Sequence, residues 1–268
     1  MYICDYHLHS CFSFDSREAV ENICEKAVAE GIREIALTDH AEFPLAENSP
    51  WPDFCRRMEV ISACRKKYGP ALTIRTGVEA GQPWRDALLE KQLLSQPMDF
   101  VIASAHTLDG FEDPHDYLFT ADNVRPFIRA YISQMTRMAQ TCDYDVLGHV
   151  TYLFRFIPPE LTDKYPPESF AEEYAELFKA VISRGKGIEV NCSGIRMPSV
   201  AKPLPSPELV KLYHDLGGEV ITVGSDGHSC RSAFLNLAAG YAALASAGFR
   251  YAASFEGRKA SFYNFLES

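Results

Sequence analysis

Side chains that commonly bind transition metals recur at a few places in this sequence. Six of the eight histidines end or follow a short apolar run, several with a carboxylate close by. The candidate ligands are His7, His9, Asp39, His40, Glu79, His106, His149, Asp226 and His228. Imidazole and carboxylate groups suit Zn²⁺, iron or Mn²⁺. The pattern therefore predicts a metal centre.

The spacing within the motifs supports this prediction. His7 and His9 are two residues apart, so on a strand both side chains point to the same face and can hold one ion together. Asp226 and His228 repeat the spacing near the other end of the chain, although Gly227 can bend the backbone between them.

Each residue also has a plain structural explanation. A lone histidine at a strand end is more often a hydrogen-bonded structural residue, and Glu79 alone could be a salt-bridge partner. Asp15 opens the run Asp15-Ser16-Arg17-Glu18, which fits a capping box for a following helix. These explanations would have to hold at every position together, so we favour the metal centre.

The candidate ligands must be positioned by elements whose ends converge. Short apolar runs predict strands over 2–7, 34–38, 72–78, 100–105, 145–147, 187–191 and 219–224. Segments of helical periodicity predict helices near 17–30, 53–68, 85–95, 122–142, 168–184, 206–216 and 231–247. Seven strand-then-helix units are typical of an α/β fold with a parallel sheet, and in a closed barrel the carboxyl ends of the strands meet on one face. The long connections 107–121 and 192–207 are expected to carry function there.

Composition limits the remaining possibilities. The chain has 268 residues without a linker or repeat, so we expect a single domain over 1–268. Its formal net charge of −10 disfavours nucleic acid as a partner. The chain has no run of 18 apolar residues and no secretory pattern at its start, so we expect a cytoplasmic protein that does not bind membranes. The eight cysteines show no C-x-x-C spacing, and we expect buried, reduced thiols.

The ordered motifs resemble those of a known family. They are His7-Leu8-His9-Ser10, Thr38-Asp39-His40, Gly77-Val78-Glu79, Ser104-Ala105-His106, Gly148-His149 and Gly224-Ser225-Asp226-Gly227-His228. Together they resemble the polymerase and histidinol phosphatase (PHP) family from residue 3 to about residue 240. The resemblance implies a distorted (β/α)7 TIM-like barrel. Residues 191–196, Asn-Cys-Ser-Gly-Ile-Arg, are similar to a segment of the monofunctional histidinol-phosphate phosphatases in this family, which implies hydrolysis of L-histidinol phosphate.

The resemblance further implies two or three divalent ions, with zinc, iron or manganese as candidates. The implied ligands of the first are His7, His9, Glu79 and Asp226. Those of the second are Glu79, which would bridge, His106 and His149. Those of the third are Asp15, His40 and His228. Some family members have a histidine at the position of Asp15, a difference that can alter affinity or metal preference.

Such a centre can hydrolyse a phosphoester without a protein nucleophile. Two cations that share a water lower its pKa towards about 7 and supply hydroxide for in-line attack on phosphorus. We expect Glu79 and Asp226 to hold these cations. Arg155 and Arg196 follow the fifth and sixth strands, and a guanidinium fork suits phosphate, so both are candidate phosphate ligands. A surface position explains either arginine equally simply.

Histidinol phosphate also carries an ammonium and an imidazole. In the loop after the fourth strand we predict that Glu112 or a neighbouring carboxylate pairs with the amine, that Phe111 or Tyr117 packs on the ring, and that His115 lines the entrance. A solvated acidic loop is the alternative. His214, near a predicted helix end, is interpreted as structural.

Other functions stay open. The nearest alternative is a PHP phosphoesterase that acts on another small phosphoester or on a nucleotide. A metal-dependent amidohydrolase and an inactive scaffold are further alternatives, disfavoured by the arginines and by the full set of ligands. The sequence gives no indication of the oligomeric state.

Overall fold

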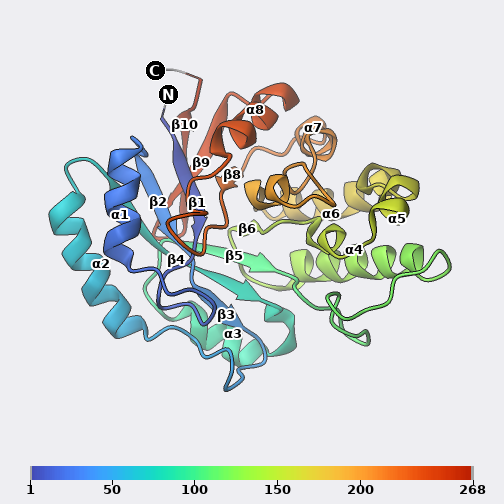
Figure 1. Cartoon of the computed structure of the whole chain (residues 1–268), viewed down its shortest axis with the longest axis horizontal. Coiled ribbons are helices and arrows are strands. Elements are labelled where there is room, and N and C mark those ends of the chain that lie inside the picture. The colour runs from blue at the N-terminus through green and yellow to red at the C-terminus, as the bar shows by residue number, and fades with distance from the viewer. Residues whose placement is uncertain (1, 267–268) are drawn as a thin grey trace.

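Within residues 2–266, which the computed structural model describes, seven parallel strands follow one another around a barrel (Figure 1). In pairing order they are β1 (Cys4–Leu8), β2 (Glu34–Leu37), β4 (Thr73–Gly81), β5 (Phe100–Ser104), β6 (Val146–Leu147), β7 (Gly187–Asn191) and β8 (Ile221–Gly224). The predicted α/β class and seven-unit barrel are confirmed. The short strand β3 (His40–Glu42) was not predicted; it pairs with the second half of β4 and sets His40 beside Glu79.

Helices cover the outside of this sheet and agree closely with the predicted segments. They are α1 (Val20–Ala29), α2 (Phe54–Tyr68), α3 (Ala87–Leu94), α4 (Val124–Thr141), α5 (Pro159–Lys164), α6 (Ala171–Ser183), α7 (Pro207–Asp215) and α8 (Leu237–Ala247). The short α5 was not predicted. The last helix begins later than expected because Phe234 and Asn236 have φ values of 68° and 64°, which a right-handed helix cannot include.

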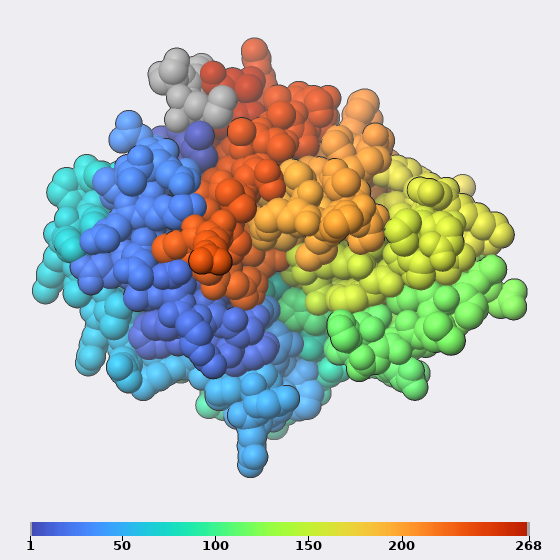
Figure 2. Space-filling view, viewed as in Figure 1, coloured from blue at the N-terminus to red at the C-terminus, as the bar shows by residue number. Residues whose placement is uncertain are grey.

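The first and last strands of the barrel meet where the metal motifs lie. The N–H of Asp226 donates to the carbonyl of His7 at 2.9 Å, and the N–H of His9 donates to the carbonyl of Gly227 at 2.9 Å. Figures 1 and 2 show the blue amino-terminal segment against the orange-red segment from the end of the chain. The barrel is therefore closed by backbone bonds between the two motifs that are farthest apart in sequence.

A carboxyl-terminal hairpin, absent from the predicted elements, covers the opposite end of the barrel. It consists of β9 (Tyr251–Glu256) and β10 (Lys259–Asn264). Phe255 packs against Tyr6 and Phe100, with ring centroids 6.2 and 4.8 Å away. In its turn, Arg258 Nε donates to Asp145 Oδ2 at 2.7 Å. Since Phe100 and Asp145 lie at the amino ends of strands, the hairpin caps the face remote from the metal motifs.

One buried arginine ties α2 to the sheet below the metal motifs. The guanidinium of Arg57 donates to the carbonyls of Leu37 and Gly77 at 2.6 and 2.7 Å, and its Nε lies 2.7 Å from Asp39 Oδ2. Asp39 in turn accepts the N–H of Ser10 at 2.6 Å. Arg57 thus links a helix, two strands and the loop after His9.

Replacing Arg57 by methionine should lower the free energy of unfolding by about 3–5 kcal/mol, because Asp39 would be left as an unpaired buried charge. The same change at the exposed neighbour Arg56 is the matched control and should change little. Denaturant unfolding of both variants measures the difference; equal stabilities would show that Arg57 does not carry the link.

The cysteine prediction is confirmed only in part. All eight are unpaired in the described chain; five are buried, Cys230 is half-buried, and Cys11 and Cys55 are exposed, contrary to expectation. No helix among residues 2–266 is long and apolar enough to cross a membrane.

Candidate metal centre

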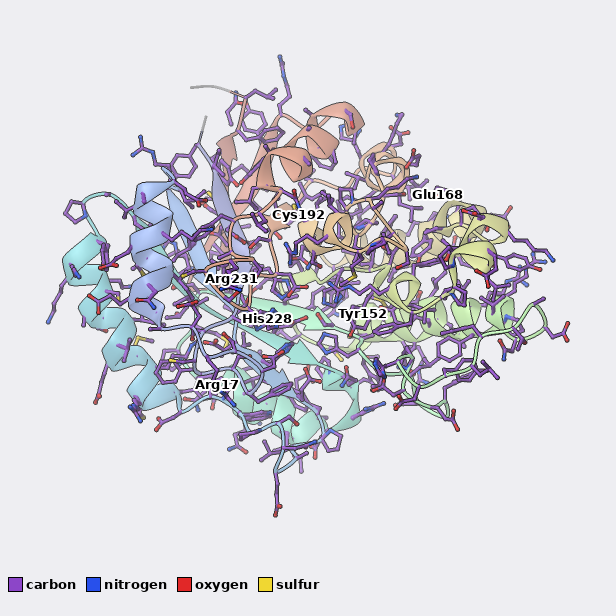
Figure 3. All side chains as sticks on the ribbon, viewed as in Figure 1. Arg17, Tyr152, Glu168, Cys192, His228 and Arg231 are labelled. Carbon is purple, nitrogen blue, oxygen red and sulfur yellow. The ribbon has the colours of Figure 1, made fainter. Side chains whose placement is uncertain are left out.

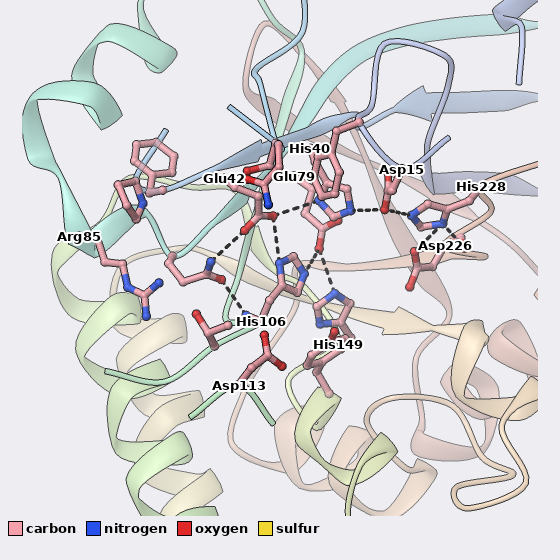
Figure 4. A pocket seen from close by; sticks show the side chains of 18 of the residues that line it. Asp15, His40, Glu42, Glu79, Arg85, His106, Asp113, His149, Asp226 and His228 are labelled. Carbon is pink, nitrogen blue, oxygen red and sulfur yellow. Dashed lines mark hydrogen bonds and ion pairs between the residues drawn. The ribbon is translucent and has the colours of Figure 1, made fainter. Parts of the chain in front are cut away.

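A cavity of about 520 Å³ opens at the carboxyl ends of the strands (Figure 4). Metal-capable side chains form its floor, and Arg85, Asp113, Tyr152 and Arg155 lie around it. Figure 3 shows His228 and Tyr152 close to the middle of the molecule in this view. The convergence predicted from strand ends is therefore present.

Glu79, at the carboxyl half of β4, occupies the centre of this cluster and is almost completely buried. Its Oε2 lies 3.0 Å from His7 Nε2 and 3.4 Å from His9 Nε2. Its Oε1 lies 3.1 Å from His106 Nε2 and 2.9 Å from His149 Nε2. One carboxylate thus faces two separate histidine pairs, as a bridging ligand must.

Asp226 completes the group around His7 and His9. Its Oδ1 lies 3.8 Å from His7 Nε2 and 3.6 Å from His9 Nε2. The residue has a φ of 54°, an unfavourable backbone conformation for aspartate that is typically retained at functional sites. The turn therefore aims the carboxylate at the two imidazoles.

Asp15 joins a third group. Its Oδ2 lies 3.0 Å from His228 Nε2 and 3.3 Å from His40 Nε2. The alternative capping-box interpretation of Asp15 is wrong, because α1 begins only at Val20 and Ala19, which precedes it, makes no side-chain cap. The three predicted ligand sets are thus each brought together.

Glu42 is a metal-capable residue that the sequence analysis missed. Its Oε1 lies 3.2 Å from His40 Nδ1 and 3.0 Å from His106 Nδ1. It follows His40 by two residues on β3, the same spacing as His7 and His9, and that spacing could have identified it.

Some of the histidines are held neutral, the form in which imidazole binds metals. Burial, with His40 and His228 nearby, lowers the pKa of His9 to about 3. Burial likewise lowers the pKa of His149. Both side chains therefore offer a free nitrogen lone pair at neutral pH.

Other groups of the cluster form ion pairs with one another. Burial lowers the pKa of His7, but the carboxylates of Glu189, Glu79 and Asp226 together raise it well above its ordinary value. Burial raises the pKa of Glu79, but the imidazoles around it hold it well below its ordinary value. Protons on these histidines must leave when a cation binds.

The donor set fits divalent metal ions. Among the described residues, His, Asp and Glu atoms form four overlapping groups of three or four, with each group's atoms within 4.8 Å of one another. His9 Nε2 is buried without a hydrogen bond, although it faces carboxylate oxygens of Glu79 and Asp226 at 3.4 and 3.6 Å. A cation between these atoms would satisfy all three.

The two candidate arginines differ in their surroundings. Arg155, in the short 3₁₀ helix η2 (Tyr152–Arg155), lines the cavity. It donates to Asp226 Oδ2 at 3.1 Å and to Ser193 Oγ, and it lies over the Tyr152 ring at 4.8 Å. Its guanidinium is therefore fixed beside the candidate metal ligand Asp226.

Arg196 has a different arrangement. It donates to the backbone carbonyls of Ser225 and Asp226 at 3.0 and 3.3 Å and is not among the residues that line the described cavity. Of these two arginines, the structure thus places Arg155 and not Arg196 at the cavity, and Arg196 supports the turn that carries Asp226.

The chain is similar to known proteins over most of its length. The sequence profile of the PHP domain matches residues 5–193, which include most of the predicted ligands. The chain belongs to the PHP family.

Relatives of this PHP chain agree with the assignment. It is 30% identical over 265 residues to the histidinol-phosphatase of Lactococcus lactis, covering 95% of each chain. It is 25% identical over 224 residues to the probable histidinol-phosphatase of Thermotoga maritima, covering 84% of this chain and 83% of that one. The crystal structure of the Lactococcus lactis histidinol phosphate phosphatase, complexed with zinc, L-histidinol and phosphate, superposes with a TM-score of 0.83 and 26% identity, covering 97% of this chain and 98% of that one.

The loop after β5 contributes other side chains to the cavity than the four that were named in the prediction. The described structure places four predicted substrate residues outside the cavity: Phe111, Glu112, His115 and Tyr117. Both aromatic rings pack on Phe127 instead, with centroids 4.7 and 4.5 Å from its ring. The two polar side chains are exposed to solvent. The loop lines the cavity through the neighbouring carboxylate Asp113.

His214 lies in the last turn of α7, with its ring 4.8 Å from that of Phe249. This position agrees with the structural role predicted for it.

Proposed function

We propose that this PHP protein hydrolyses L-histidinol phosphate to L-histidinol and inorganic phosphate. The observation that carries the proposal is that residues of all three ligand sets line one cavity together with Arg155. The barrel around this cavity resembles a phosphatase complexed with zinc, L-histidinol and phosphate. The likeness extends over nearly the whole of both chains, so it supports the activity as well as the fold.

Two or three divalent ions, with zinc favoured by the related structure, would be held by the predicted sets. The first set is His7, His9, Glu79 and Asp226. The second is Glu79, His106 and His149. The third is Asp15, His40 and His228, with Glu42 beside it. When bound, such ions lower the pKa of water and offset the charge of the phosphoryl oxygens.

The side chains of the cavity wall position the phosphoryl group. The guanidinium of Arg155 donates to Asp226 and to Ser193 at the edge of the cavity. A phosphoryl oxygen of the substrate can take the place of Ser193 as the acceptor. Burial raises the pKa of Tyr152 to about 12, so its hydroxyl stays protonated and can donate. These residues fix the ester without forming a bond to phosphorus.

The rest of the substrate meets a cavity with carboxylate and aromatic walls. We propose that Asp113 takes the part predicted for a carboxylate of this loop and pairs with the substrate ammonium. The ring of Phe14 or of Tyr152 offers an apolar surface for the imidazole. A neutral phosphoester would lack the contact with Asp113.

Phosphate release from L-histidinol phosphate, compared with release from a generic aryl phosphate, tests the proposed function. For the metal-loaded protein we expect kcat/KM above about 10⁴ M⁻¹s⁻¹ with the first substrate and far less with the second. Comparable slow turnover of both would reject histidinol phosphate and favour a different small phosphoester.

Replacing Arg155 by methionine should lower kcat/KM for histidinol phosphate about 10²-fold, because a lost charge-assisted hydrogen bond costs about 3 kcal/mol. Arg196→Met is the matched control; we expect lower stability and a smaller kinetic effect, since its donors serve backbone carbonyls. Metal content is measured in both because Arg155 contacts Asp226. Equal kinetic losses in the two variants would contradict the separate roles.

A further inference from the structure

A carboxylate beneath the metal centre belongs to none of the predicted ligand sets. Glu189 lies on β7, is fully buried and does not line the cavity. Its Oε1 lies 2.6 Å from His7 Nδ1. Its Oε2 accepts the backbone N–H of His149 at 2.9 Å and Asn191 Nδ2 at 3.2 Å. One side chain therefore contacts a ligand of the first metal set and the backbone of a ligand of the second.

We infer that Glu189 is a positioning residue that holds His7 in the form that presents the Nε2 lone pair to a metal. A carboxylate only accepts, so His7 Nδ1 must carry the proton that lies between the two groups. The other nitrogen, Nε2, lies 3.0 Å from the bridging Glu79, so the proton on Nε2 is the one that a binding cation displaces. Carboxylates that accept from the second nitrogen of a ligating histidine fix the ring and raise its basicity.

A glycine of the last motif, Gly224, leaves the space that this carboxylate needs. A Cβ on Gly224 would collide with Glu189 Oε1 and with the Cβ of His7. A Cβ on Gly148 would lie 3.7 Å from Glu189 Oε2 and only 2.5 Å from Ser104 Oγ. Both glycines precede metal ligands in their motifs. The close approach of Glu189 thus accounts for the glycine at 224, whereas Ser104 and Ile102 account for the glycine at 148.

A glutamine at position 189 separates this role from simple packing. The amide keeps the volume of the carboxylate but offers one acceptor and one donor. If the backbone N–H of His149 keeps the acceptor, the amide NH₂ faces His7 Nδ1. His7 must then accept at Nδ1 and carry its proton on Nε2, which opposes metal binding. We expect this variant to retain the fold, while His7 carries its proton on the nitrogen that should bind the metal.

The experiment is a zinc titration of metal-free protein in competition with a chromophoric chelator. In Glu189→Gln we expect the affinity for one zinc equivalent to fall about 10–100-fold, as for other outer-shell partners of metal ligands. Excess zinc should restore kcat. The metal-free variant should melt close to the wild type, whereas the rise in melting temperature on adding zinc should shrink. Wild-type zinc affinity in this variant would overturn the inference.

Glu34→Gln is the matched control. Glu34 is also a buried glutamate on a barrel strand, but it pairs with Arg75 and Tyr6 at the opposite end. This variant should bind zinc as the wild type does. An equal loss of affinity in both variants would show that any buried carboxylate of the barrel has this effect, and would overturn the specific role of Glu189.

A second measurement on the wild type covers the case in which Glu189→Gln does not fold. In the zinc-loaded protein, nitrogen-resolved NMR should show a slowly exchanging proton on His7 Nδ1. A freely exchanging proton, or zinc bound through Nδ1, would overturn the inference. The inference rests on the metal centre of the proposed function, not on its substrate: absence of zinc binding by the wild type refutes both, whereas full binding by Glu189→Gln refutes only the positioning role.

Discussion

Glu79→Gln should lower kcat/KM by about 10³-fold, because the charge that joins two metal sets is lost and with it several kcal/mol of transition-state stabilisation. Both carboxylate oxygens face imidazoles at 3.4 Å or less, so a glutamine NH₂ must face at least one nitrogen that should be a metal ligand. We therefore expect metal content to fall together with activity.

Steady-state kinetics and elemental analysis of the purified variant measure this effect. Glu34→Gln, which changes a buried glutamate at the other end of the barrel, should keep both activity and metal. If Glu79→Gln retains its full metal content and nearly full activity, Glu79 is not a bridging ligand, and the centre must be held by the histidines and Asp226.

Removal of the metals by a chelator should abolish phosphatase activity and lower the melting temperature by about 10 °C. A ligand present at a thousand times its Kd stabilises a fold by about 4 kcal/mol, and in a protein of this size each kcal/mol shifts the melting temperature by about 2–4 °C. Zinc or manganese should restore both properties. Calorimetry with and without the chelator measures the stability.

Recovery should be weaker at low pH, because protons compete for the ligands. Burial lowers the pKa of His40, but Glu79, Asp15 and Glu42 raise it to about 10. A raised pKa means that this histidine binds its proton tightly in the metal-free fold, so zinc must displace it over the whole range below that value. Zinc affinity that rises with pH is therefore expected.

For the chelation experiment, activity that survives exhaustive removal of the metals would contradict a catalytic role for metals.

The convergence of the candidate metal ligands was predictable because each belongs to a short local pattern. The spacing of His7 and His9 identifies them as a pair on one face of a strand. Each candidate ligand at a strand end is positioned by the barrel. A parallel barrel brings such ends together whatever the intervening helices contain. Residues distant in sequence could thus be assigned to one site before their distances were known.

Residues whose role depends on the direction in which the side chain points were harder to predict. Nothing in the local sequence distinguishes Glu189, pointing inward below His7, from any buried strand residue. In the loop after β5, the prediction named Glu112 or a neighbouring carboxylate without choosing between them, and the structure places the neighbour Asp113 at the cavity. Arg196 and Arg155 both follow strands in the sequence, and the structure separates them: Arg196 donates to backbone carbonyls, whereas Arg155 lines the cavity. The hairpin β9–β10 was missed because its main partners, such as Phe100, lie far away in the chain.

The backbone bonds between His7, His9 and the segment 226–227 also bear on how the protein is made. β1 leaves the ribosome before the strand and turn that close the barrel against it. Until then β1 has one unpaired edge, and the first ligand set lacks Asp226. A chain that stops before this segment therefore lacks one carboxylate of the first predicted ligand set, and it also lacks the backbone bonds that close the barrel.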